Sequence, residues 1–146
     1  MQGFPHHYHV TATASSSGDV RVSADGLPEL ATQAPAEFGG PGDRWSPETL
    51  LAAAVADCFV LSFRAIANAS KFEYATLECA VEGVLDRVER SMRFTGFTVR
   101  ARLSVPAGTD EARALKLLEK AEQSCLITNS LNAETHLEAE VVSAAG

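Results

Sequence analysis

Apolar residues dominate the stretch from Ser46 to about Asn68 and recur at steps of three and four, which predicts a helix. Ser46 can cap the first free backbone N–H groups, and Pro47 suits the first helical position, where no N–H is needed. The remaining positions are mostly Ala, Val and Phe, so we expect a central helix that is buried on most sides. The expected core-facing stripe consists of Leu50, Leu51, Ala54, Val55, Cys58, Leu61, Ser62, Ala65 and Ile66.

A second apolar stripe begins after Thr109 or Asp110, either of which can cap a helix. Cys125 lies at the end of this stripe, just before residues 128–130, a Thr-Asn-Ser sequence that should stop the helix. Cys58 and Cys125 therefore lie on two helices far apart in the sequence, and they can meet only if those helices pack together. The second stripe consists of Ala114, Leu115, Leu117, Leu118, Ala121 and Cys125.

Alternation of apolar and polar residues predicts strands on both sides of the central helix. Three short strands come first, separated by turns, and two long alternating segments after the helix predict an antiparallel hairpin. One more strand follows the second helix. This order predicts an α+β fold in which antiparallel sheets pack around the central buried helix, within a single domain over residues 1–146. The expected strands span residues 7–14, 20–24, 29–33, 75–88, 93–105 and 135–142, and an irregular loop rich in Pro and Gly spans residues 34–45.

The central helix is apolar on more sides than one sheet can cover. Leaving the extra face in water would be unfavourable, because apolar surface gains free energy when it is removed from water. A second copy of the chain would cover that face, so we expect a tight homodimer.

Composition is that of an ordinary globular protein. The chain has 146 residues, of which 46% are hydrophobic and 21% charged, and this length suffices for one domain with its own core. The formal net charge of −7 argues against nucleic acid or an anionic membrane as the main partner. The apolar run Leu50–Leu61 is too short to span a bilayer, and residues 1–7 lack the pattern of a signal peptide. We therefore expect a cytoplasmic protein with no membrane partner.

Cys58 has two interpretations, a small buried hydrophobe or a nucleophilic thiolate. A reactive thiolate needs a nearby positive charge or hydrogen-bond donor to lower its pKa. Glu48, earlier on the same predicted helix, cannot activate a thiol directly, but its carboxylate can hold an arginine that does. The candidate arginines are Arg44, just before the helix, and Arg21, on the second strand; each can equally be a solvated surface residue.

The other candidate residues point less clearly to chemistry. Cys125 lies at a helix C-terminus, where the helix dipole disfavours a thiolate, so it suits either a resolving thiol or an unreactive residue at the edge of the core. Cys79 lies on the inward face of a strand and is expected to pack there. His7 and His9 would share a strand face, but no acidic or cysteine partner is spaced to complete a metal site.

Two motifs carry a resemblance to a known family. The first reads Ser46-Pro47-Glu48-x-Leu50-Leu51-Ala52-Ala53-Ala54-x-Ala56-x-Cys58-Phe59, and the second reads Ala121-Glu122-x-x-Cys125-x-x-x-Asn129-Ser130-Leu131. With the order of elements, they make the chain similar to the OsmC/Ohr family over about residues 7–142. These are the osmotically induced and organic hydroperoxide resistance proteins. The resemblance implies an OsmC-like fold and an intertwined homodimer with its sites at the interface.

The resemblance also implies a cysteine-based peroxidase that prefers organic hydroperoxides to hydrogen peroxide. Cys58 would attack the peroxide, giving a sulfenic acid and an alcohol. Cys125 would condense with the sulfenic acid to a disulfide, which an external dithiol would reduce. Glu48 would hold the arginine that stabilises the thiolate. No metal, haem, flavin or other cofactor is implied.

Two positions depart from the hydroperoxide-resistance branch of that family. The first turn, residues 15–19, lacks the arginine that follows glycines in that branch, so Arg21 or Arg44 would have to serve Glu48. Leu126 stands where a proline commonly follows the second cysteine. The chain is therefore more similar to a broader OsmC-like subgroup.

Two other functions remain as hypotheses. The first is a non-catalytic, small-molecule-binding OsmC-like protein of the stress response, in which the dimeric pocket holds an apolar ligand and Cys58 is unreactive. The second is a hydrolase in which His136, on the last strand, approaches Cys58 and acts as its base.

Overall fold

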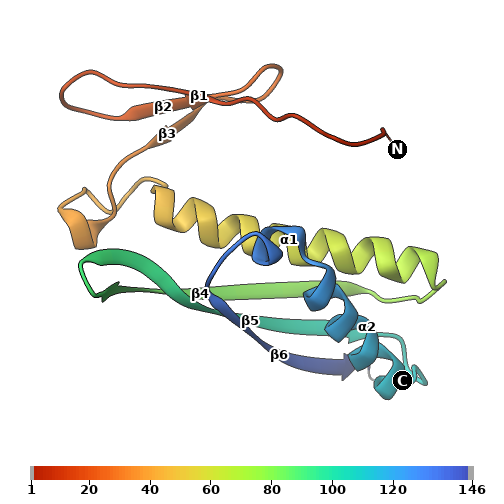
Figure 1. The fold of residues 1–146 in the computed structure, drawn as a ribbon. Coiled ribbons are helices and arrows are strands. Elements are labelled where there is room, and N and C mark those ends of the chain that lie inside the picture. Colours follow the sequence, from red (N-terminus) through yellow and green to blue (C-terminus); the bar gives the residue numbers. More distant parts are fainter. Residues whose placement is uncertain (1, 145–146) are drawn as a thin grey trace. The chain divides into compact units, whose positions relative to one another are not determined.

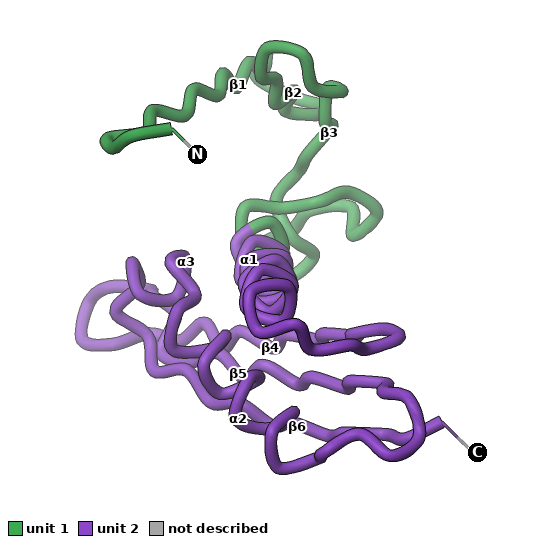
Figure 2. The backbone as a smooth tube through the Cα atoms, turned by 90° about the vertical axis from the view of Figure 1, so that its right-hand side faces the viewer, with its two compact units in different colours: residues 1–50 green, residues 51–146 purple. Residues whose placement is uncertain are grey.

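The computed structural model describes residues 2–144 and divides into two compact units, one up to Leu50 and one from Leu51 onward (Figure 2). The first unit holds three short strands and a 3-10 turn, and helix α1 continues from it into the second unit. In chain order the elements are β1 (Thr11–Thr13), β2 (Val20–Ser23), β3 (Leu30–Thr32), η1 (Ala36–Phe38), α1 (Pro47–Ala69), β4 (Thr76–Val88), β5 (Ser91–Val105), α2 (Glu111–Ser124), α3 (Leu126–Asn129) and β6 (Glu134–Ser143).

The first unit contains an antiparallel sheet in the order β1-β2-β3. The predicted first strand over residues 7–14 is shorter than expected, because only Thr11–Thr13 pair with β2 and the residues before them have no strand partner. The turns fall where Gly18 and Gly26 adopt positive φ angles of 89° and 76°, a conformation that glycine adopts without steric cost. The loop after β3 returns to the sheet through a parallel bridge between Thr32 and Trp45.

Helix α1 begins with a reciprocal cap between Ser46 and Thr49. The backbone N–H of Thr49 donates to Ser46 Oγ at 3.1 Å, and the backbone N–H of Ser46 donates to Thr49 Oγ1 at 2.8 Å. Each side chain thus satisfies an N–H group that the first turn leaves free. The helix predicted from Ser46 to about Asn68 is confirmed, with its cap at the expected serine.

The buried face of α1 differs from the predicted stripe. Its fully buried residues are Val55, Phe59, Phe63 and Ala67, one every four positions, whereas Leu61 is 49% exposed. The predicted stripe was wrong to omit Phe59 and Phe63, because burying two large rings removes more apolar area from water than burying leucine and alanine.

Helix α1 is also buried less completely than expected. Of its most apolar window of 18 residues, 22% are buried within the structure. By length and composition alone the helix could cross a membrane, so the expectation that no stretch is long enough was wrong. The core helix of a soluble protein meets the same two criteria, and one face of α1 packs on a sheet, as described next.

The second unit contains a sheet in the order β4-β5-β6 (Figure 1). Strands β4 and β5 form the predicted long antiparallel hairpin, whereas β6 pairs with β5 in parallel. The expectation of purely antiparallel pairing was therefore wrong for the last strand. Helix α2 carries the chain back along the sheet before β6 begins, and such a crossover makes two strands parallel.

Helices α1 and α2 pack on the same face of this sheet and share one core with it. The inward residues of β5 are Phe97, Val99, Ala101, Leu103 and Val105, and α2 contributes Ala114, Leu118 and Ala121. Arg100 and Arg102 point to the opposite face, as their alternation with the apolar residues predicted. The prediction of an α+β fold is confirmed by two three-stranded sheets and three α-helices among residues 2–144.

Candidate thiol site

Cys58 lies in the middle of α1 and is half-buried. Ser62 follows one helical turn later, so its side chain lies beside that of Cys58 on the helix surface. The Sγ atom of Cys58 and the Oγ atom of Ser62 are 3.9 Å apart, within hydrogen-bond reach for sulfur. The sequence placed Ser62 on the apolar stripe and missed this contact, although the spacing of four residues was a signal for it.

Cys125 lies where α2 ends and the short helix α3 begins. It is 2% exposed, and its extended backbone (φ −65°, ψ 106°) separates the two helices. The prediction that a helix ends at this cysteine is confirmed. The sequence analysis missed α3, whose first residues, Leu126 and Ile127, have backbone N–H groups that no earlier turn of α3 can satisfy.

The structure brings Cys58 and Cys125 together. Burial would raise the pKa of Cys58, but hydrogen bonds from the backbone N–H of Ile127, the Cys125 thiol, the Ser62 hydroxyl and the backbone N–H of Leu126 outweigh it and lower this pKa. Two helices far apart in the sequence therefore deliver their thiols to one site within the second unit.

The pKa of Cys125 shifts in the opposite direction. Burial raises it first, and the contact with Cys58 raises it further, despite hydrogen bonds from the backbone and hydroxyl of Thr128. The opposite shifts have one physical cause, because a hydrogen bond from the Cys125 thiol to the Cys58 sulfur favours loss of the proton from Cys58 and retention of the proton on Cys125. The two neighbouring cysteines therefore differ in the direction of their pKa shifts, since the pKa is lowered for Cys58 and raised for Cys125.

Cys79 lies on β4 and packs partly buried against the core. Burial and the nearby charge of Cys125 raise its pKa to about 11. Cys79 is therefore a neutral thiol near neutral pH, in line with the packing role expected for it.

Glu48 lies in the first turn of α1 with its Oε1 atom buried and without a hydrogen-bond partner among the described residues. The two candidate arginines bind other carboxylates in this structure. Arg21 pairs with Glu29 at 2.8 Å, and the Nε atom of Arg44 lies 3.3 Å from Asp19. A buried carboxylate oxygen without a donor costs free energy, so Glu48 is a position that a donor would stabilise.

The histidine hypotheses gain no support. His136 lies on β6 with a side chain that is 71% exposed, and it alternates with the core residue Leu137, so it faces away from α1 and Cys58. The hydrolase hypothesis is therefore wrong in its choice of base. Among residues 2–144 no three His, Cys, Asp or Glu side chains gather as a metal site would need.

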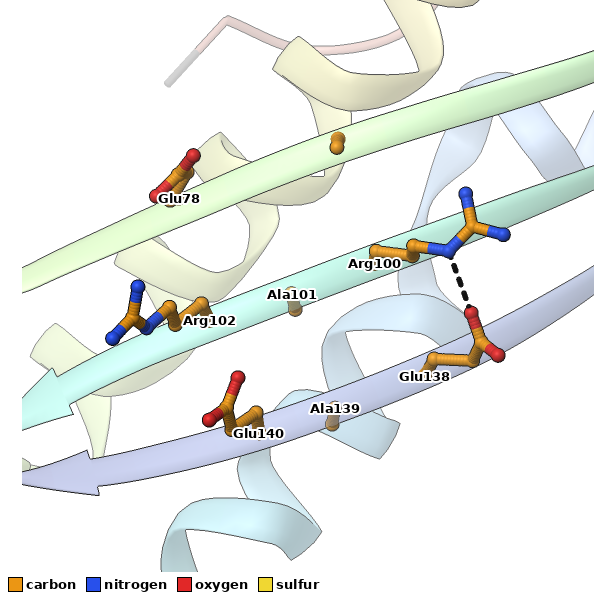
Figure 3. A pocket seen from close by; sticks show the side chains of 8 residues that line it. Glu78, Arg100, Ala101, Arg102, Glu138, Ala139 and Glu140 are labelled. Atoms are coloured by element: carbon orange, nitrogen blue, oxygen red, sulfur yellow. Dashed lines mark hydrogen bonds and ion pairs between the residues drawn. The ribbon is translucent and has the colours of Figure 1, made fainter.

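A hollow of about 340 Å³ lies over the β4-β5-β6 sheet, lined largely by charged side chains (Figure 3). Arg100 donates to Glu138 there at 2.8 Å across the parallel pair of strands. Glu78, also in this lining, is on the face of β4 opposite to its neighbour Cys79. The charged hollow and the thiol site therefore lie on different faces of the sheet.

Comparison with known proteins identifies the family. The family described as OsmC-like protein matches residues 40–140, a range that contains Glu48, Cys58 and Cys125. A Bacillus subtilis protein, the uncharacterized protein YmaD, is 28% identical over 142 residues, covering 93% of this chain and 95% of the relative.

Two further proteins carry functional names. The organic hydroperoxide resistance protein of Xanthomonas axonopodis pv. citri is 33% identical over 123 residues, or 84% of each chain. The crystal structure of an organic hydroperoxide resistance protein OsmC from Legionella pneumophila matches with a TM-score of 0.75 at 26% identity, covering 96% of this chain and 99% of that one. The expected resemblance is thereby confirmed in both sequence and fold, and the chain belongs to the OsmC-like protein family.

Proposed function

We propose that this protein reduces organic hydroperoxides to alcohols, and hydrogen peroxide more weakly, with Cys58 as the reacting thiol. The observation that carries the proposal is the contact between Cys58 and Cys125, whose pKa values shift in opposite directions. A lowered pKa supplies the thiolate that attacks peroxides, and a protonated thiol beside it is ready to react with the oxidised product. The names of the Xanthomonas and Legionella relatives agree with this chemistry.

The reaction proceeds in two steps. The Cys58 thiolate attacks one oxygen of the hydroperoxide, so that an S–O bond forms, the O–O bond breaks, and the departing alkoxide takes a proton to become the alcohol. The Cys125 thiol then attacks the Cys58 sulfenic acid, forming the S–S bond and releasing water. An external dithiol reduces this disulfide by exchange and restores both thiols.

In this proposal Glu48 holds an arginine that adds positive charge near the thiolate. Arg44, in the same compact unit and just before α1, is the first candidate, and Arg21 is the second. Either arginine would have to leave its present carboxylate partner. The buried, unpartnered oxygen of Glu48 supports this part of the proposal.

The proposal also includes a homodimer that works in the cytoplasm. Strands of three and four residues make a sheet too small to be stable without further packing, and α1 exposes apolar residues such as Leu61. A second copy of the chain would supply the missing contacts. A cytoplasmic location suits a chain with three free thiols.

The test is intact-mass analysis of the reduced protein after one equivalent of cumene hydroperoxide, followed by peptide mapping. A loss of two hydrogens that maps to a Cys58–Cys125 bridge is expected. Cys58→Ser should abolish peroxide consumption, and Cys125→Ser should leave a Cys58 sulfenic acid that dimedone traps. Cys79→Ser is the matched control and should behave as the wild type does.

One observation favours a second candidate, a binding protein for an apolar ligand. Neither arginine contacts Glu48 in this structure, so the charge that the peroxidase proposal assigns to the site is held elsewhere. An unchanged mass after peroxide treatment, with the thiols of Cys58 and Cys125 still free, would favour that candidate and contradict the peroxidase.

A further inference from the structure

Ser62 supplies the side-chain oxygen that lies within hydrogen-bond reach of the Cys58 sulfur. It lies between two apolar residues of α1, Leu61 and Phe63, in a helix whose sequence is otherwise mostly apolar. Its Oγ atom is 3.9 Å from Cys58 Sγ, and both side chains are half-buried. A hydroxyl in this position can donate its proton to a thiolate.

The hydroxyl of Ser62 does not follow the usual pattern of a serine in a helix. Such a hydroxyl ordinarily donates to the backbone carbonyl four residues earlier. Ser124 does so to the carbonyl of Lys120 at 2.6 Å, and Ser130 does so to that of Leu126 at 2.7 Å. For Ser62 the structure records the thiol of Cys58 as the partner, again four residues earlier.

Neutral donors converge on Cys58 from two elements. Ser62 lies on its own helix, and the backbone N–H groups of Leu126 and Ile127 come from the start of α3. The titratable group that faces Cys58 is the Cys125 thiol, and Cys125 in turn raises the pKa of Cys79 on β4. Within this unit the thiolate thus depends on hydrogen bonds from neutral groups.

We propose that Ser62 is a positioning residue for the reaction of Cys58: its hydroxyl donates to the Cys58 sulfur and holds it toward the N–H groups of Leu126 and Ile127. The effect of Ser62 on catalysis rests on the proposed function, whereas its effect on the Cys58 thiolate does not. It extends that function by naming a side chain on α1 itself as a donor to the thiolate, in addition to the arginine assigned to Glu48.

The test compares Ser62→Ala, Ser62→Thr and the control Ser124→Ala, whose hydroxyl binds a backbone carbonyl and not a thiol. The readout is the rate of alkylation of Cys58 by iodoacetamide as a function of pH, with the modified cysteine identified by peptide mapping. Ser62→Ala should slow alkylation at pH 7 by about three- to tenfold and move the titration midpoint to higher pH, since a lost donor destabilises the thiolate. Ser62→Thr keeps a hydroxyl and should restore most of the wild-type rate, and Ser124→Ala should match the wild type.

An alkylation profile of Ser62→Ala that coincides with that of the wild type would overturn the inference. So would equal slowing in Ser62→Thr and Ser62→Ala, because the loss would then not depend on the hydroxyl. Urea unfolding of each variant tests for a purely structural role. In that case Ser62→Ala would lower the free energy of unfolding but leave the pH midpoint of Cys58 alkylation unchanged, and this result would also contradict the proposal.

The alkylation readout requires no peroxide, so it separates this inference from the proposed function. If the wild type consumes no cumene hydroperoxide while Ser62→Ala still shifts the alkylation profile, the proposed peroxidase function is contradicted, and the proposal that Ser62 stabilises the Cys58 thiolate is supported. If both hold, the second-order rate constant with cumene hydroperoxide should fall in Ser62→Ala by about the same factor as alkylation.

Discussion

The three thiols of this protein differ in what surrounds each sulfur atom. Donors lower the pKa of Cys58, burial and a neighbouring thiolate raise that of Cys125, and burial raises that of Cys79 to about 11. Reactivity toward peroxides and alkylating agents belongs to the thiolate form. The surroundings therefore make Cys58 the most reactive of the three residues.

This difference in reactivity predicts the order of modification by iodoacetamide. At pH 7 we expect Cys58 to be alkylated first, because a larger fraction of it is thiolate, and Cys125 and Cys79 to be modified more slowly. Time-resolved alkylation with peptide mapping measures the three rates. Faster modification of Cys79 than of Cys58 would contradict the assignment.

The raised pKa of Cys79 predicts a change in stability at alkaline pH. The folded protein keeps the Cys79 proton up to about pH 11, whereas the unfolded chain releases it near the ordinary value of 9.0. Between these two values the folded state binds more protons than the unfolded chain. The contribution of Cys79 to the free energy of unfolding is therefore constant below about pH 9 and declines as the pH rises toward 11. Urea unfolding at several pH values should show that Cys79→Ala loses less stability than the wild type over that interval. Parallel losses in both proteins would show that other groups cause the decline.

At the scale of single elements, α1 owes its orientation to the residues that it buries. Phe63 is fully buried, and Leu61, two positions earlier, is half exposed. We expect Phe63→Ala to lower the free energy of unfolding by about 3–5 kcal/mol, the usual cost of removing a buried ring. Leu61→Ala, measured in the same urea titration at low protein concentration, should cost much less. Equal losses would show that the buried face has been assigned wrongly.

The β4-β5 hairpin allows a similar comparison between two glycines. A Cβ atom added at Gly83 would lie 2.7 Å from the ring of the buried Phe97, whereas one added at Gly96 would meet nothing closer than 3.6 Å. Gly83→Ala should therefore destabilise the protein by about 1–3 kcal/mol, the usual cost of overpacking a core. Gly96→Ala should be close to neutral, and thermal unfolding of the two variants checks the contrast.

The sequence predicted the elements well and their mutual arrangement less well. Caps and turns mark where elements begin and end, so Ser46 was predicted as a cap, and Asp110 was one of two candidates, with Thr109, for the cap of α2. A helix apolar on most sides has no unique inner face, and for this reason the stripe of α1 was misassigned. The alternation along β6 is the same for parallel and antiparallel pairing, so only the packing of α2 determines its direction.

Only part of the candidate site could be predicted from the sequence. The motifs identified Cys58 and Cys125, and the structure brings them into contact. The donors from Leu126 and Ile127 are backbone groups, which any residue except proline supplies, so side-chain identity could not reveal them. The position after Cys125, where the sequence resemblance led us to expect proline in the hydroperoxide-resistance branch, is occupied here by Leu126, which retains its N–H group.

At the scale of the whole molecule, the exposed apolar face of α1 and the small first sheet lead us to expect a homodimer. Sedimentation equilibrium should give twice the 15.5 kDa mass of the chain. Leu61→Glu places a charge on the exposed face and should shift the equilibrium toward monomer, since a buried unpaired charge is costly. A monomeric wild type at all concentrations would contradict this expectation.

The path of the chain through the second unit has a consequence for protein synthesis. A ribosome releases α1 and the β4-β5 hairpin well before Cys125, α3 and β6. During that interval a nascent chain carries Cys58 without the thiol and N–H groups of residues 125–127 that lower its pKa. Cys58 then has only Ser62 of these donors, so it becomes fully reactive only when residues 125–127 have folded against α1. A translation product truncated before residue 125 should therefore resist oxidation at Cys58 better than the complete protein does.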